Sequence, residues 1–194
     1  MQLTRRLVLA SRSPRRIALL KQIGLQAAVI PSSIIETFDD SISPEENARS
    51  LALAKARAVC HKVADGVIIG ADTMVVLDGV MLGKPVDPPD AARMLRMLSG
   101  RVHRVITAFA LVDCPGDRSI TESEETAVTF RVLPSSEIER YVAGGSPMDK
   151  AGSYGIQDDY GAVFVSRIEG CFYNVVGFPL SRLYVALQKF TPTA

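Results

Sequence analysis

The sequence predicts an α/β fold, in which strands and helices alternate along a chain of 194 residues. The apolar run VII at residues 67–69 has the composition of a strand that is buried on both faces. Two helix starts are equally plain, because Ser13 and Ser43 are capping residues that each precede a proline. A chain of this length forms one domain, or one domain with two lobes.

Local signals bound the elements in order. Gly24 stops the first helix, Glu46 completes a capping box at the start of the second, and Asp78-Gly79 is a hairpin dipeptide. The polar segment 118–125 is expected to project from a long ribbon. The expected strands are residues 7–10, 27–30, 67–69, 74–77, 80–82, 102–112, 126–133 and 162–168, and the expected helices are residues 14–23, 44–64, 87–99, 136–144 and 180–190.

Asp72 follows the central apolar run directly, at the expected end of a buried strand. A buried carboxylate is unfavourable unless a cation pairs with it, and a metal ion or a phosphate-bound cation is the usual partner. The hairpin at residues 78–79 would bring Lys84 to the same end of the strand pair. A buried ion pair between Asp72 and Lys84 is therefore the alternative to a functional carboxylate.

A phosphate site is predicted where the first strand meets the first helix. Arg15 and Arg16 lie in the first helical turn, where the positive end of the helix dipole disfavours a cation. An anion bound there, by free amides, the guanidinium groups and the Ser11 hydroxyl, would remove that conflict. A solvated arginine pair is the alternative. Lys55 lies on an alanine-rich helix face, where a snorkelling side chain is the alternative to a functional lysine.

Composition excludes several classes of partner. A net charge of +1 does not indicate binding to nucleic acid or to an anionic membrane. No apolar run reaches membrane-spanning length. Cys60, Cys114 and Cys171 show no CxxC spacing, which predicts reduced thiols, no zinc site and a cytoplasmic protein. His61 and His103 are far apart in sequence, and both are interpreted as structural.

Six segments together resemble the Maf family of nucleoside triphosphate pyrophosphatases, and the resemblance covers nearly the whole chain. The segments are LASRSPRR (9–16), ALAKARAV (52–59), GADTMV (70–75), GKP (83–85), SGRVHRVITA (99–108) and DKAGSYGIQ (149–157). The resemblance implies an elongated mixed β-sheet flanked by helices, related to the inosine triphosphate pyrophosphatase group. It also implies a single domain over residues 1–194, either undivided or with two lobes and an active-site cleft between them, and a homodimer.

The resemblance further implies hydrolysis of a nucleoside triphosphate between the α and β phosphates, with a divalent metal cation such as Mg or Mn. By motif match, Asp72 is the catalytic proton acceptor, and Glu36 and Asp72 hold the metal. The phosphate-handling positions are Ser11, Arg15, Arg16, Lys55 and Lys84. Arg15, Thr73 and Gln157 match the branch that acts on dTTP and UTP, and the Gln157 amide can complement part of a uracil or thymine edge.

Two alternatives to that activity remain open. The branch acting on 7-methyl-GTP is similar in the front half but carries a different sequence at the GSYGIQ loop. A non-catalytic nucleotide-binding regulator of cell division is the other, although a pure binder gains nothing from the carboxylate of Asp72. One departure from the family pattern is visible, because Asp158-Asp159-Tyr160 follow Gln157 where a glycine is expected.

Overall fold

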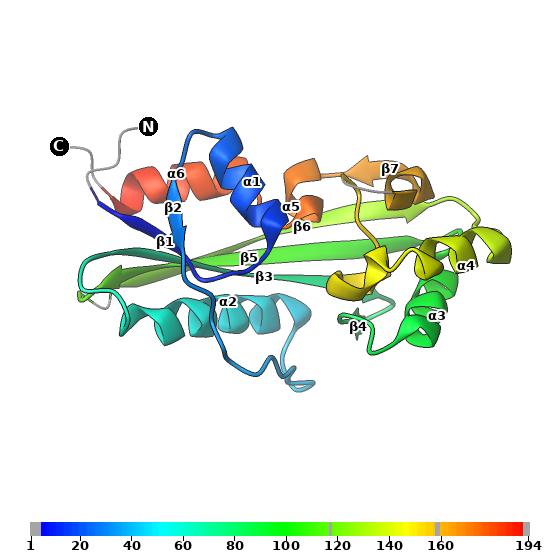
Figure 1. Cartoon of the computed structure of the whole chain (residues 1–194), viewed down its shortest axis with the longest axis horizontal. Helices are drawn as coiled ribbons and strands as arrows, with labels where there is room; N and C mark the ends of the chain where they lie inside the picture. Colours follow the sequence, from blue (N-terminus) through cyan, green and yellow to red (C-terminus); the bar gives the residue numbers. More distant parts are fainter. Residues whose placement is uncertain (1–4, 117, 158–159, 192–194) are drawn as a thin grey trace. The chain divides into compact units, whose positions relative to one another are not determined.

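The computed structural model describes residues 5–116, 118–157 and 160–191. Seven strands within these residues form one sheet in the order β2-β1-β3-β5-β6-β7, with β4 paired to β3 (Figure 1). β1 pairs in parallel with β2 and with β3, whereas β4 is antiparallel to β3 and β7 is antiparallel to β6. The predicted α/β class with a mixed sheet flanked by helices is confirmed.

The strands and helices follow the predicted order closely. The strands are β1 (Leu7–Leu9), β2 (Ala27–Val29), β3 (Gly66–Leu77), β4 (Val80–Leu82), β5 (Val102–Cys114), β6 (Ser119–Phe130) and β7 (Val165–Glu169). The helices are α1 (Pro14–Gln22), α2 (Pro44–Cys60), α3 (Pro88–Leu98), α4 (Ser135–Ala143), α5 (Phe172–Val176) and α6 (Leu180–Phe190). Within the described part of the chain, no helix combines the length and apolarity needed to cross a membrane.

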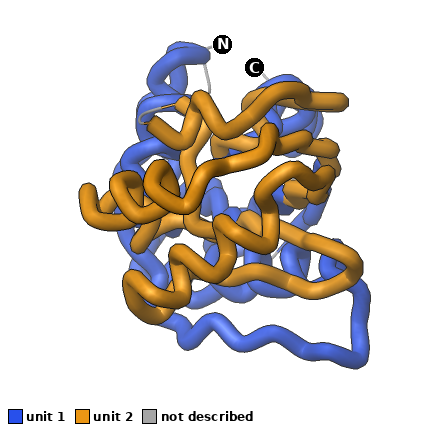
Figure 2. The backbone as a smooth tube through the Cα atoms, turned by 90° about the vertical axis from the view of Figure 1, so that its right-hand side faces the viewer, with its two compact units in different colours: residues 1–72, 107–124, 177–194 blue, residues 73–106, 125–176 orange. Residues whose placement is uncertain are grey.

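The chain divides into two compact units (Figure 2). Unit 1 consists of residues 1–72, 107–124 and 177–194, and unit 2 consists of residues 73–106 and 125–176. The strands β3, β5 and β6 each contribute residues to both units.

In unit 1, α2 covers one face of the strands while α1 and α6 cover the other (Figure 1). α2 packs very closely on β3, because a Cβ added at Gly70 would stand only 2.1 Å from the carbonyl oxygen of Ala52. Ala48, Ala52 and Ala56 are fully buried on that helix face. Glycine on the strand and alanine on the helix therefore allow the backbones to approach, and this brings the side chains of α2 to the level of the strand.

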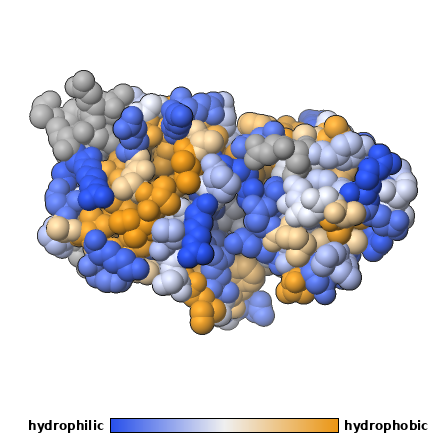
Figure 3. Space-filling model, in the orientation of Figure 1, coloured by the Kyte–Doolittle hydropathy of each residue, from blue (hydrophilic) through white to orange (hydrophobic). Residues whose placement is uncertain are grey.

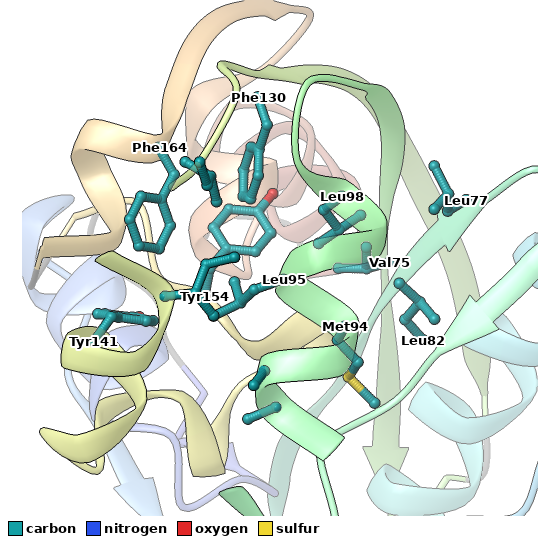
Figure 4. Packing of buried hydrophobic residues seen from close by; sticks show 14 of the residues in the cluster. Val75, Leu77, Leu82, Met94, Leu95, Leu98, Phe130, Tyr141, Tyr154 and Phe164 are labelled. Atoms are coloured by element: carbon teal, nitrogen blue, oxygen red, sulfur yellow. The ribbon is translucent and has the colours of Figure 1, made fainter. Parts of the chain in front are cut away.

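The core of unit 2 contains a group of packed aromatic rings. The rings of Phe130, Tyr154 and Phe164 are all buried, and neighbouring rings meet edge to face (Figure 4). Aromatic pairs in this geometry contribute about 0.5–1.5 kcal/mol beyond their buried area. Leucine and methionine side chains of α3 complete the cluster.

Both predicted helix starts are confirmed at atomic detail. The Ser13 hydroxyl accepts a hydrogen bond from the backbone N–H of Arg16, and Ser43 and Glu46 form the reciprocal capping box. The end of α2 differs from the prediction, since the helix stops at Cys60 and not near Ala64.

Two predictions about strands are wrong. β3 does not end before Asp72 but runs unbroken from Gly66 to Leu77, because the carboxylate has a buried partner and the strand need not stop. The polar segment 118–125 does not project, since β6 begins at Ser119 and only Arg118 and Glu125 of this segment are exposed. Its polar side chains are paired, as the Ser123 hydroxyl shows by donating to Glu45 Oε1 at 2.5 Å.

The prediction of three reduced thiols is wrong for two of them. Cys60 at the end of α2 and Cys114 at the end of β5 form a disulfide with a Cα–Cα distance of 5.7 Å, while Cys171 is free. The two cysteines are 54 residues apart and carry no spacing motif, so the sequence offered no signal for the pairing. The prediction of a cytoplasmic protein loses the support that it drew from reduced thiols.

Candidate active site

Lys55 lies between two carboxylates in unit 1. Its Nζ is 2.5 Å from Asp72 Oδ1 and 2.8 Å from Glu36 Oε1. Lys55 is 7% exposed and Asp72 is 5% exposed, whereas the Glu36 side chain is 39% exposed. The lysine therefore does not snorkel to solvent, and its alternative interpretation is wrong. Because removing both charges from water is unfavourable, the loss of either partner would leave an uncompensated buried charge.

The environment of Asp72 acts on its protonation in two directions. Burial raises the pKa of Asp72, and the nearby cations Lys55 and Arg16 oppose that rise. A carboxyl group whose pKa is raised lies closer to the pH at which a general base works best. Asp72 thus has the protonation chemistry of a candidate proton acceptor, held in place by Lys55.

Arg16 is buried and is engaged by the protein itself. Its Nε donates to the carbonyl oxygen of Gly177 at 3.0 Å, and its Nη1 donates to the carbonyl oxygen of Ala71 at 2.9 Å. The guanidinium also stands over the Phe178 ring at 5.7 Å. The alternative of a solvated arginine is therefore wrong for Arg16. Since Ala71 immediately precedes Asp72, Arg16 fixes the backbone beside the carboxylate.

The Ser11 hydroxyl connects this arginine to the turn before α1. Ser11 Oγ accepts hydrogen bonds from Arg16 Nη1 at 3.3 Å and from the backbone N–H of Ser13 at 3.2 Å. Arg15, the neighbouring residue in the first turn, is half-buried. The turn thus gathers Ser11, Arg15 and Arg16 at the end of β1, as the sequence predicts.

The other predicted site residues belong to unit 2. Thr73 is half-buried and follows Asp72 on β3, while Lys84 and Gln157 are exposed. Lys84 makes no ion pair within the part of the chain that the structure describes, and the buried partner of Asp72 is Lys55. Asp158 and Asp159, where the loop departs from the family pattern, lie outside the described residues.

Glu36 and Asp72 are the predicted metal ligands, and their oxygens converge on one cation, the ammonium of Lys55. Carboxylate oxygens are ligands that Mg²⁺ accepts, commonly one or two of them together with substrate phosphates. Among the described residues, no group of three or more His, Cys, Asp or Glu side chains is placed to hold a metal ion. In this structure the two carboxylates hold the Lys55 ammonium, and two carboxylates are also a donor set that Mg²⁺ accepts beside substrate phosphates.

Sequence reasoning missed how these residues support one another. The roles of Arg16 toward Gly177 and Ala71, and of Lys55 toward Glu36, depend on contacts between distant segments. The one available signal was the charged Lys55 within an alanine-rich helix face.

Comparison of the sequence with known proteins identifies the family. The sequence model described as "Maf: Maf-like protein" matches residues 6–190. The dTTP/UTP pyrophosphatase of Moorella thermoacetica is 50% identical over 186 residues, which cover 95% of each chain. The proteins of the same name from Bacillus velezensis and Caldicellulosiruptor bescii are 48% and 47% identical, over 97% and 95% of this chain and 98% and 94% of theirs.

A solved structure, that of the Staphylococcus aureus Ham1 protein, aligns with 64% of this chain and 71% of its own at 17% identity, with a TM-score of 0.46. That likeness is too low to support a conclusion. The family match and the curated relatives span almost the whole sequence, and they confirm the resemblance that the six motifs indicated. The chain belongs to the Maf family.

Proposed function

We propose that this protein hydrolyses dTTP and UTP between the α and β phosphates, giving the nucleoside monophosphate and pyrophosphate. The observation that carries the proposal is the buried Asp72 held by Lys55 beside Glu36. These residues lie in a chain about half identical to relatives named dTTP/UTP pyrophosphatase.

The chemistry needs what this site provides. Attack on a phosphorus that already carries negative charge requires cations on the phosphate oxygens and a carboxylate that activates water. Asp72 accepts the proton of the attacking water. Lys55 holds the Asp72 carboxylate in place. Glu36 and Asp72 would hold a divalent cation such as Mg or Mn, which would neutralise part of the phosphate charge.

The phosphate contacts divide between the cationic residues. Arg16 is occupied by backbone carbonyls, so it contributes mainly its charge and the position of Ser11. Arg15, which is less buried, and Lys84, which is exposed, are the side chains that contact the phosphates. A hydrogen bond from a charged donor to a phosphate oxygen is roughly twice as strong as one between neutral groups.

Preference for dTTP and UTP is assigned to Arg15, Thr73 and Gln157. A uracil or thymine ring presents two carbonyl groups that flank one N–H. The NH₂ of the Gln157 amide can donate to a carbonyl oxygen, and the amide oxygen can accept from the ring N–H. Polar readout of this kind discriminates by up to about ten-thousandfold when a mismatch leaves buried groups unpaired.

Pyrophosphate release should be measured over a panel of dTTP, UTP, CTP, dATP, GTP and 7-methyl-GTP, with magnesium and with manganese. We expect the highest kcat/KM for dTTP and UTP. Faster turnover of 7-methyl-GTP than of UTP would reassign the protein to the other branch. Tight nucleotide binding without pyrophosphate release would favour the non-catalytic regulator.

A homodimer, a cytoplasmic location and a cleft between two lobes remain proposals. Large apolar side chains stand exposed at Ile35, Val86 and Val132, at 86%, 85% and 76%, and one face of the surface mixes apolar and hydrophilic patches (Figure 3). Side chains that are exposed singly are also normal in a monomer, so the proposed dimer rests on the family resemblance alone. Light scattering at micromolar concentration should give twice the chain mass, and monomer mass would remove the dimer.

A further inference from the structure

The loop that carries Gln157 is anchored by a buried tyrosine. Residues 152–155 are buried, Ile156 is half-buried and Gln157 is exposed, so the chain leaves the core of unit 2 within two residues. The Tyr154 ring lies in the aromatic cluster beside Phe130, with ring centroids 4.7 Å apart (Figure 4). The hydroxyl of Tyr154 is 2.7 Å from Nε2 of His103, a residue of β5.

His103 and Tyr154 form a neutral pair. His103 is 2% exposed, and burial lowers the pKa of its imidazole to about 4. Burial also raises the pKa of the Tyr154 phenol, so neither side chain is charged near neutral pH. Nδ1 of His103 has no hydrogen-bond partner within the described residues. Loss of the Tyr154 hydroxyl would therefore leave both ring nitrogens buried without a partner, which is unfavourable.

The same loop is joined to the segment that carries Lys84. The backbone N–H of Gly152 donates to the carbonyl oxygen of Gly83 at 3.0 Å, and Gly83 directly precedes Lys84. Gly152 has a φ of +66°, and an added Cβ would stand 2.9 Å from Val75. Only glycine suits this position. The backbone beside Lys84 is thus hydrogen-bonded to the loop, and the loop is anchored in the core by Tyr154.

We infer that His103 and Tyr154 are positioning residues for base recognition, which anchor the loop of Gln157 through their mutual hydrogen bond. This inference rests on the proposed function, in which Gln157 reads the base and Lys84 binds phosphate. It also gives a role to His103, which the sequence indicated only as structural. A loop held loosely at Tyr154 would present the Gln157 amide in several orientations, and discrimination between bases would weaken.

The Tyr154→Phe variant removes the hydroxyl and keeps the ring in its packing. Steady-state kcat and KM should be measured for UTP and CTP, whose base edges differ in donors and acceptors. We expect the UTP-to-CTP ratio of kcat/KM to fall about three- to tenfold, the effect of one lost hydrogen bond, and to fall mainly through KM for UTP. Tyr141→Phe is the matched control, because Tyr141 is a buried tyrosine of the same cluster on α4. Its ratio should stay at the wild-type value.

A second pair of variants separates positioning from packing. A glutamine at position 103 can replace the imidazole Nε2 as a hydrogen-bond partner, whereas phenylalanine cannot. His103→Gln should retain more of the UTP preference than His103→Phe. The same pair also gives the test if Tyr154→Phe does not fold.

The outcomes are distinguishable. A Tyr154→Phe protein that melts at a lower temperature but keeps the wild-type UTP-to-CTP ratio would overturn the inference and leave the proposed function intact. Equal ratios in His103→Gln and His103→Phe would overturn it in the same way. A wild-type protein that releases no pyrophosphate from any nucleotide would overturn the proposed function, and the inference with it.

Discussion

Each unit contains one buried pair of polar side chains, and the two pairs differ in charge. Lys55 and Asp72 in unit 1 are 2.5 Å apart and charged, whereas His103 and Tyr154 in unit 2 are 2.7 Å apart and neutral. In the charged pair, Lys55 also forms an ion pair with Glu36. The neutral pair is joined by one hydrogen bond, and Nδ1 of His103 has no hydrogen-bond partner within the described residues.

The difference indicates what each pair is suited to do. A buried charge is costly and is kept where a negative or positive group is needed for chemistry. A buried neutral hydrogen bond costs little when satisfied and fixes geometry. We therefore assign chemistry to the Lys55–Asp72 pair and loop geometry to the His103–Tyr154 pair, and the following variants test that division.

Removing the lysine should have the largest effect on stability. Lys55→Met leaves Asp72 buried without its cation, and breaking a buried pair costs roughly 3–5 kcal/mol. The pKa of Asp72 should rise further, so the loss should be smaller at pH 5 than at pH 8, because a protonated Asp72 needs no cation. Urea denaturation measures both. Lys62→Met, at an exposed lysine just after α2, should change stability by less than about 0.5 kcal/mol. A Lys55→Met protein as stable as that control would contradict the account of the charged pair.

The helix that carries Lys55 is also tied down by the Cys60–Cys114 disulfide. Closing a loop of this length contributes up to about 4 kcal/mol, so a thiol reductant should lower the free energy of unfolding by about that amount. Under denaturing, non-reducing conditions, alkylation should label Cys171 alone. Cys171→Ser should leave the effect of the reductant unchanged. Alkylation of all three cysteines would show that the protein as isolated lacks the bond.

The neutral pair predicts a pH dependence of stability. The pKa of His103 is about 4 in the folded protein and about 6.5 when unfolded. Between these values the unfolded chain binds more protons, so stability is complete above pH 6.5 and falls as pH is lowered toward 4, by up to about 3 kcal/mol. His103→Gln should flatten the slope in that window. An unchanged slope in urea denaturation would mean that other groups cause it.

The smallest effect is expected from Lys84 and Arg15, the two cations that the proposed function places on the phosphates. Lys84→Ala and Arg15→Ala should each lower kcat/KM for UTP at least tenfold, since a charged hydrogen bond contributes roughly 1.5–3 kcal/mol. The stability of Lys84→Ala should hardly change, because Lys84 is exposed. Lys62→Ala serves as the control with wild-type kinetics. Unchanged kinetics in either test variant would show that the substituted residue does not bind the substrate phosphates.

The sequence predicted what depends on local signals. Helix starts at Ser13 and Ser43 were predictable because caps and prolines act within one turn. The buried partner of Asp72 on β3 was not predictable, since Lys55 lies 17 residues away on α2. The motifs named the site residues. The support that Arg16 gives to the backbone at Ala71 is a contact across 55 residues, which no local pattern reveals.

The most direct test of the central claim is a paired measurement on Asp72→Asn, with thermal melting and single-turnover hydrolysis of UTP on one preparation. If Asp72 is the proton acceptor, hydrolysis should fall by a factor on the order of 100 to 10,000 while UTP still binds. The variant should also melt at a lower temperature, because Lys55 loses its buried partner and keeps only Glu36. Binding should survive because a negative charge near the substrate phosphates has been removed. A folded variant with wild-type turnover would contradict the claim.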